Sequence, residues 1–157
     1  FYKDPLYIAL PEGHPAGRYA YFKEGVQGPY LDISHLMDSA FILTQKHKKT
    51  RQAADKVLNH FGAVEPFMVS QSIETVIGLV ANGMGVSLVP QIYTRIYNTG
   101  AKIQYYHIEE SLDACWSMAV AYYRDMPLTK PAKEFLRLLK TTSTLFPDYI
   151  MPNVFER

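Results

Sequence analysis

Two periods of apolar and polar residues follow one another along the chain, and they predict strands and helices in turn. Short apolar runs rich in β-branched and aromatic residues predict strands, whereas apolar residues spaced three and four apart predict helices. Strands are expected at residues 6–10, 40–44, 67–69, 86–89, 102–107 and 116–123. A helical turn is expected at 31–36, and longer helices at 50–61, 73–82, 90–97 and from 131 onward. This alternation predicts an α/β fold with mixed, largely parallel sheets.

Two of these helices carry clear start and stop signals. Thr50 and Ser72 stand at the expected beginnings, where a hydroxyl can accept a hydrogen bond from a free backbone N–H. Gly62 and Gly83 stand after the last apolar positions, where glycine commonly ends a helix. Gly85 follows, and it lets the chain turn sharply into the next strand with no side chain in the way.

The second half of the chain gives further predictions. Pro90 suits the first turn of a short helix, which Gly100 then breaks. Residues 116–123 are nearly all apolar, which predicts a strand buried on both faces. Pro131 opens an amphipathic helix, and no regular pattern assigns a structure to the tail, 143–157. The apolar stripe of that last helix consists of Phe135, Leu136, Leu138 and Leu139.

Composition and charge narrow the possible classes of protein. The formal net charge of +1 argues against nucleic-acid binding by this chain itself, because DNA-binding domains usually carry a clear basic surplus. No window of about 18 apolar residues could span a bilayer, so no membrane partner is expected. The single cysteine, Cys115, excludes an internal disulfide framework and fits a reducing, cytoplasmic compartment. Its apolar neighbours favour a small buried hydrophobe over a nucleophile.

Enzymatic functions find little support in the sequence. There is no Gly-x-Ser-x-Gly elbow, P-loop or dinucleotide fingerprint, and Ser87 lies within a buried strand pattern. The histidines are scattered without metal-ligand spacing, and there is no second cysteine to complete a pair. We therefore expect no catalytic residues, no cofactor and no metal ion.

Three ordered segments together resemble the effector-binding domain of LysR-type transcription regulators. Residues 5–15 are similar to that family's strand followed by a His-Pro turn. Residues 72–90 are the longest and most specific match, because they contain a helix, a Gly-x-Gly turn, a buried strand and a proline in the family's order. Residues 123–136 resemble the return strand and the last helix. The resemblance extends over residues 5–142.

The resemblance implies a periplasmic-binding-protein type II-like domain, with two α/β lobes and a ligand cleft between them. Residues 1–13 would then hold part of the first lobe and a crossover strand, and 14–123 the complete second lobe. Residues 124–142 would return to the first lobe and end in its last helix, and 143–157 would form a tail. The missing elements of the first lobe, a linker helix and a DNA-binding winged helix-turn-helix would precede Phe1.

Two loops that follow predicted strands form the expected effector site, because ligands of α/β sheets bind beyond the carboxyl ends of the strands. One loop follows residues 40–44 and leads to a helix whose free N–H groups favour an anion, with a basic run at 46–51 beside it. The other follows residues 67–69 and also meets the start of a helix. The candidate ligand-binding residues are Thr44, Gln45, His47, Ser70, Gln71 and Ser72. We expect a small anionic effector, a carboxylate or a phosphate compound.

Alternatives remain open for these residues and for the whole chain. A run of charged residues such as 46–51 is usually a solvated basic turn, and capping alone would explain Ser72. The favoured function is a bacterial, cytoplasmic effector sensor that modulates DNA binding by the missing N-terminal domain. A solute-binding protein of a transport system is the main alternative, and a small α/β enzyme is disfavoured. The resemblance also implies a homo-dimer or tetramer. An incomplete first lobe would leave the stripe at 135–139 partly uncovered and prone to self-association.

Overall fold

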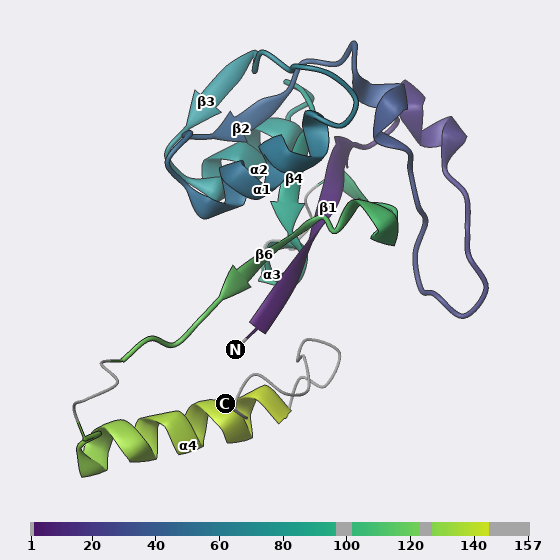
Figure 1. Ribbon diagram of the computed structural model, residues 1–157. Coiled ribbons are helices and arrows are strands. Elements are labelled where there is room, and N and C mark those ends of the chain that lie inside the picture. Colours follow the sequence, from purple (N-terminus) through teal and green to yellow (C-terminus); the bar gives the residue numbers. More distant parts are fainter. Residues whose placement is uncertain (1, 97–101, 123–126, 145–157) are drawn as a thin grey trace. The chain divides into compact units, whose positions relative to one another are not determined.

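The computed structural model describes residues 2–96, 102–122 and 127–144 (Figure 1). The chain forms two compact units, one made of residues 5–116 and the other of residues 1–4 with 117–157. The predicted helix stop at Gly100, the predicted strand end at Tyr123 and most of the tail lie outside the described residues.

Strands and helices alternate in the larger unit, as the pattern predicts. In chain order the elements are β1 (Tyr2–Pro11), η1 (Pro15–Tyr19), η2 (Ile33–Leu36), β2 (Ile42–Thr44), α1 (Lys49–Leu58), β3 (Met68–Ser70), α2 (Ile73–Ala81), β4 (Ser87–Pro90), α3 (Gln91–Ile96), β5 (Ile103–His107), η3 (Glu110–Leu112) and β6 (Cys115–Met118), where η denotes a 3₁₀ helix. One further helix, α4 (Lys130–Thr144), belongs to the smaller unit.

Parallel and antiparallel pairing both occur among the strands. β2 and β3 are parallel neighbours, and a parallel bridge between Phe41 and Val86 joins the segments that lead into β2 and β4. β1 lies between β4 and β5 and is antiparallel to both; β6 also pairs with β1. Antiparallel pairing therefore has a larger share than predicted, because an apolar run reveals the burial of a strand but not its direction.

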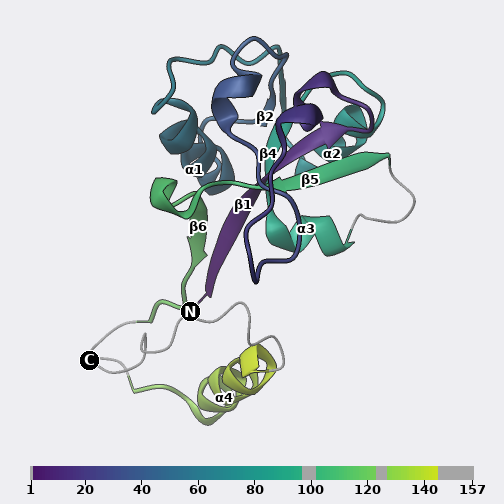
Figure 2. The same ribbon diagram turned by 90° about the vertical axis from the view of Figure 1, so that its right-hand side faces the viewer.

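The core lies in two layers on opposite faces of the strands. Leu6, Ile8 and Leu10 of β1 join one apolar cluster, which contains the inner face of α1. Ala9 joins the other cluster, which contains the inner face of α2. Figure 2 shows α1 and α2 on opposite sides of the strands. The alternation of side chains along a strand thus produces a three-layer α/β/α arrangement in this unit.

The predicted helix boundaries are confirmed at α2 and shifted at α1. The hydroxyl of Ser72 accepts from the Thr75 N–H at the start of α2, and Gly83 follows its end with φ of +74°. α1 begins one residue before Thr50, and its cap residue, Lys48, makes no side-chain capping bond. Gly62 comes four residues after the last residue of α1 and still adopts a positive φ, +139°.

Two predictions from the second half of the chain are wrong in detail. Pro90 is the last residue of β4 and precedes the first turn of α3. β6 ends at Met118, and Tyr122 beyond it is 62% exposed, so residues 116–123 do not form one strand buried on both faces. Cys115 is half-buried, and its thiol donates to Asp113. An apolar run predicts burial but not the length of a strand, and β6 contains only the first part of this run, as far as Met118.

α4 presents part of its apolar stripe to solvent. Phe135 is 60% and Leu138 50% exposed, whereas Leu136 and Leu139 are half-buried. Self-association through this stripe stays a prediction. None of the helices that the structure describes combines the length and apolarity needed to cross a membrane.

Candidate functional site

The two predicted effector loops lie side by side because β2 and β3 are parallel neighbours. Thr44 and Ser70, the last residues of these strands, are opposite each other in the register. The backbone N–H of Gln45 donates to the Ser70 carbonyl at 3.1 Å, so pairing continues into the loops. α1 and α2 both begin just beyond this edge. The strand ends and two helix N-termini therefore meet in one place.

A pocket of about 420 Å³ opens at this place. Its volume is within the range that holds a small metabolite. The residues that line it are Thr44, Lys48, Lys49, Thr50, Gln71, Ser72, Ile73, Glu74, Tyr93 and Trp116. Three of the six predicted site residues, Thr44, Gln71 and Ser72, are in this lining. The other three lie nearby but outside the lining: Gln45 and His47 in the loop after β2, and Ser70 at the end of β3.

The start of α1 makes one end of this pocket favourable for an anion. The first backbone N–H groups of a helix have no partner within the helix and carry a positive partial charge. At α1 no side chain caps them, and Lys48 and Lys49, both exposed, add two ammonium groups. Thr44 and Thr50 contribute hydroxyls whose oxygens lie 3.3 Å apart. Hydroxyls and N–H groups together can donate several hydrogen bonds to a carboxylate or phosphate.

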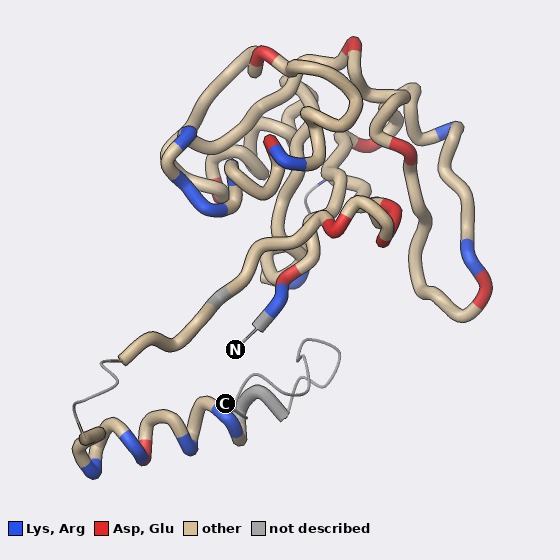
Figure 3. The backbone as a smooth tube through the Cα atoms, in the orientation of Figure 1, with Lys and Arg blue, Asp and Glu red and all other residues tan. Residues whose placement is uncertain are grey.

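The basic run at 46–51 divides into two parts with different environments. Residues 46–49 are exposed, as expected for a solvated turn, and the lysines of the run are among the residues drawn in blue in Figure 3. Arg51 is instead only 3% exposed. Its Nη1 donates to the Thr44 carbonyl at 2.9 Å and its Nε to Asp55 Oδ1 at 2.7 Å. The expectation that Arg51 adds a cation to an open basic turn is therefore wrong, because this guanidinium lies inside the unit.

Comparison with known proteins gives a family for the chain. The family model described as the LysR substrate binding domain matches residues 1–144. The chain belongs to the LysR substrate-binding-domain family. This confirms the predicted resemblance and, with it, the periplasmic-binding-protein type II-like α/β fold.

Solved structures of regulators resemble this LysR domain over most of its length. The regulatory domain of Synechocystis PCC6803 CcmR in complex with 2-PG is 23% identical with a TM-score of 0.72, covering 90% of this chain and 64% of that one. The effector-binding domain of QuiR in complex with shikimate is 17% identical with a TM-score of 0.62, covering 87% and 59%. HinK, a LysR family transcriptional regulator from Pseudomonas aeruginosa, is 26% identical with a TM-score of 0.66, covering 88% and 45%.

The LysR domain described here is shorter than these structures. It spans less than two thirds of each of the three chains. The first two similarities, at under 25% identity, establish the fold alone. A search of curated proteins finds no significant match.

The aromatic part of the LysR domain's pocket was not predicted from the sequence. Tyr93 lies on the short helix α3, and Trp116 lies on β6, within the run 116–123 whose apolar pattern predicts a doubly buried strand. With Ile73 they add apolar surface to the lining of the pocket. Tyr93 and Trp116 reach the site because α3 and β6 lie near the ends of β2 and β3 in the folded chain. No local sequence pattern predicts this tertiary arrangement.

Ser72 has a structural role that can be separated from ligand contact. Its hydroxyl accepts from the Thr75 N–H at 3.3 Å and donates to Glu74. We expect Ser72→Ala to lower the free energy of unfolding by about 1 kcal/mol because α2 loses its cap, and Ser72→Asn to restore most of it. Urea denaturation measures both. Equal stability of Ser72→Ala and the unmodified chain would contradict the capping role.

A second cavity of about 180 Å³ lies elsewhere in the larger unit. It is lined by Leu31, Asp32, Ile33, Phe61, Ile108, Glu109, Ser111 and Leu112. None of the predicted effector residues is in this lining, and its two charged residues are both acidic. This cavity is less suited to an anion than the pocket at the ends of β2 and β3. Across residues 2–96, 102–122 and 127–144, no group of three or more His, Cys, Asp or Glu side chains is arranged to hold a metal ion.

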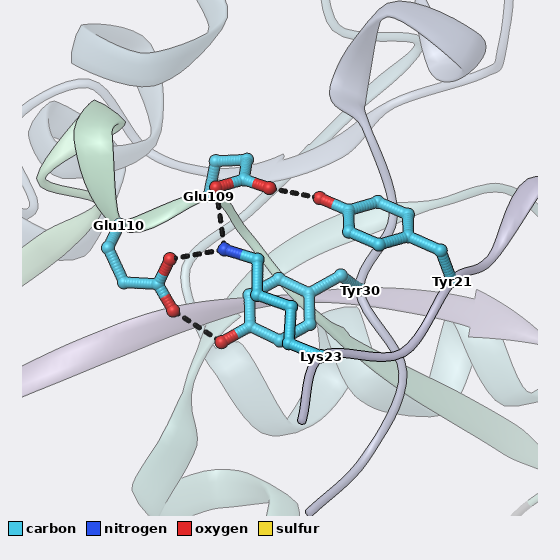
Figure 4. A network of polar contacts seen from close by, with 5 residues as sticks. All are labelled: Tyr21, Lys23, Tyr30, Glu109 and Glu110. Carbon is cyan, nitrogen blue, oxygen red and sulfur yellow. Dashed lines mark hydrogen bonds and ion pairs between the residues drawn. The ribbon is translucent and has the colours of Figure 1, made fainter. Parts of the chain in front are cut away.

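Another polar cluster, the clasp, consists of Tyr21, Lys23, Tyr30, Glu109 and Glu110 (Figure 4). The Lys23 ammonium lies between the two carboxylates, at 2.8 Å from Glu109 and 2.7 Å from Glu110. The tyrosine hydroxyls donate to the same carboxylates, Tyr21 to Glu109 and Tyr30 to Glu110. The clasp thus ties the loop after η1 to the segment after β5. None of its members lines the larger pocket.

Acid should loosen the clasp. Hydrogen bonds from Lys23 and then Tyr30 lower the pKa of Glu110 from 4.5 to about 2. A carboxyl with a depressed folded-state pKa stabilises the fold above its unfolded-state pKa, and this contribution is lost as pH falls from about 4.5 to about 2. We expect the free energy of unfolding to fall more steeply over that range in the unmodified chain than in Glu110→Gln. Parallel urea-denaturation curves against pH would contradict this prediction.

Proposed function

We propose that this LysR substrate-binding domain is the effector-sensing part of a bacterial transcription regulator, and that it binds a small anionic metabolite in the pocket at the ends of β2 and β3. One observation carries the proposal: the uncapped N-terminus of α1, two lysines and the Thr44 and Thr50 hydroxyls all border the same pocket. CcmR with 2-PG and QuiR with shikimate support a small-molecule effector.

The six predicted residues take different parts in this proposal. Thr44, Gln71 and Ser72 contact the effector from the pocket lining. Gln45 and Ser70 hold the two loops together through their backbone bond, and His47 adds a polar side chain in the exposed turn. Ile73, Tyr93 and Trp116 cover the apolar part of the molecule. A compact acid with a hydrocarbon body fits this combination.

The effector acts on the parent protein by distinguishing two of its states. A ligand shifts an equilibrium only as far as its affinities for the two states differ, and a full switch needs a difference of about 5.5 kcal/mol. In the parent protein proposed here, residues 14–123 form the second lobe and residues 124–142 return to the first. An N-terminal winged helix-turn-helix outside this chain binds DNA. The parent protein is cytoplasmic and forms a homo-dimer or tetramer. Its action is regulation and not catalysis. No specific observation favours transport of a solute.

Calorimetric titration with shikimate and inorganic phosphate tests the proposal. We expect binding that weakens in Lys48→Ala and Lys49→Ala and that also weakens as salt rises, because exposed charges are screened. Lys46→Ala is the matched control, since this lysine has the same charge and exposure but lies outside the lining. Binding of only neutral or cationic compounds, or equal losses in all three variants, would refute the anion site.

A further inference from the structure

Arg51 is the only arginine or lysine that is buried among the described residues. It lies in the first turn of α1, beside the anion pocket but outside its lining. Burying a guanidinium is costly unless its charge is paired and its N–H groups donate. Asp55 supplies the charge partner one turn along the same helix. The guanidinium makes a second hydrogen bond, to the backbone carbonyl of Thr44, and Thr44 lines the pocket.

That second contact joins the strand end to the helix start. Arg51 Nη1 donates to the carbonyl of Thr44, the last residue of β2, across the loop that leads into α1. The hydroxyl oxygens of Thr44 and Thr50 also lie within hydrogen-bonding distance of each other, 3.3 Å apart. Between them, the Lys48 N–H donates to the Gln45 carbonyl at 3.0 Å. The loop at 45–48 is therefore closed at its base by the buried guanidinium.

We propose that Arg51 is a positioning residue of the anion pocket, an inference that rests on the function proposed above. It acts through Thr44: by holding the Thr44 carbonyl, it fixes the Thr44 hydroxyl and the first N–H groups of α1 in one orientation. Hydrogen bonds weaken steeply when their angle changes, so this orientation sets the affinity for the anion. The planar fork of arginine reaches Thr44 and Asp55 at once, whereas a lysine ammonium is one compact group on a flexible stem.

The first test needs no ligand. Amide hydrogen exchange is measured by NMR in the 157-residue chain, in Arg51→Lys and in Arg51→Met. We expect the amides of Gln45 and Lys48 to exchange roughly tenfold faster or more in Arg51→Met, and less so in Arg51→Lys, since a bond to a charged group is lost or weakened. Lys56→Met is the matched control, because it removes an exposed ion pair from the same helix, Lys56 with Asp113. Unchanged exchange in Arg51→Met would overturn the proposal.

The second test separates positioning from a merely structural role. Calorimetry gives the Kd for inorganic phosphate and for shikimate in chains whose circular dichroism shows them folded. We expect roughly tenfold weaker binding in Arg51→Lys, which corresponds to the loss of one charge-assisted hydrogen bond. Binding should be unchanged in Lys56→Met. Unchanged affinity in a folded Arg51→Lys would overturn the positioning role. If Arg51→Met fails to fold, Arg51→Lys decides alone. If the unmodified chain binds neither anion, the proposed function fails, and the exchange rates still decide whether Arg51 orders the loop.

Discussion

Replacing Gly85 by alanine is expected to destabilise the larger unit severely, by on the order of 3 kcal/mol or more. A Cβ at this position would lie 2.2 Å from the backbone carbonyl oxygen of Ala40. That carbonyl accepts from the Val86 N–H at 2.9 Å, and the Val86 carbonyl accepts from Ile42, so backbone and not a flexible side chain would have to move. The change would separate the segments that lead into β2 and β4. Urea denaturation measures the loss.

Gly78→Ala is the matched control for Gly85→Ala. Gly78 lies within α2, and a Cβ there would meet no atom within 4 Å. Alanine loses less conformational entropy in a helix than glycine, so this substitution should raise the free energy of unfolding by roughly 0.5–1 kcal/mol. Similar effects of the two substitutions would show that close approach of the strands is not the reason for glycine at 85.

Asp55→Ala should have the second-largest effect, a loss of about 3 kcal/mol, at the lower end of the cost of removing one partner from a buried ion pair. Asp55 itself is 35% exposed, but its partner Arg51 is 3% exposed and would keep a buried positive charge without a counter-charge. The matched control is Glu134→Ala in α4, which breaks an exposed pair with Arg137 at 2.6 Å and should leave stability unchanged. Both are measured by urea denaturation. Equal effects would contradict the argument that burial of Arg51 decides the cost.

The sequence predicts those features of the fold that depend on local pattern. The cap at Ser72 and the stop at Gly83 are confirmed because a hydroxyl before an apolar helix and a glycine after it act within one turn. The expectation that position 85 leaves no room for a side chain is also confirmed, because a Cβ there would lie 2.2 Å from the Ala40 carbonyl oxygen. The antiparallel direction of β4 and β5 beside β1 was not predicted, because burial and not direction determines which residues are apolar.

Only the part of the candidate site that depends on local pattern was predicted from the sequence. The apolar pattern locates the strand ends: Thr44 ends β2, Gln71 and Ser72 follow the end of β3, and all three line the pocket. Tyr93 and Trp116 reach it from elements distant in sequence, so only the tertiary fold brings them there. Arg51 stands in a run of basic residues that looks uniformly solvated. Its burial depends on the carbonyl of Thr44 and the carboxylate of Asp55, and neither contact can be recognised from a charge pattern.

The position of a bound anion decides whether the effector site lies at the ends of β2 and β3. Backbone amide chemical shifts are followed by NMR while shikimate is added to the 157-residue chain. We expect the largest changes at Thr44, Thr50 and Ser72, where the ends of β2 and β3 meet the starts of α1 and α2. Changes centred instead on Phe61 and Ile108, which line the smaller cavity, would contradict it.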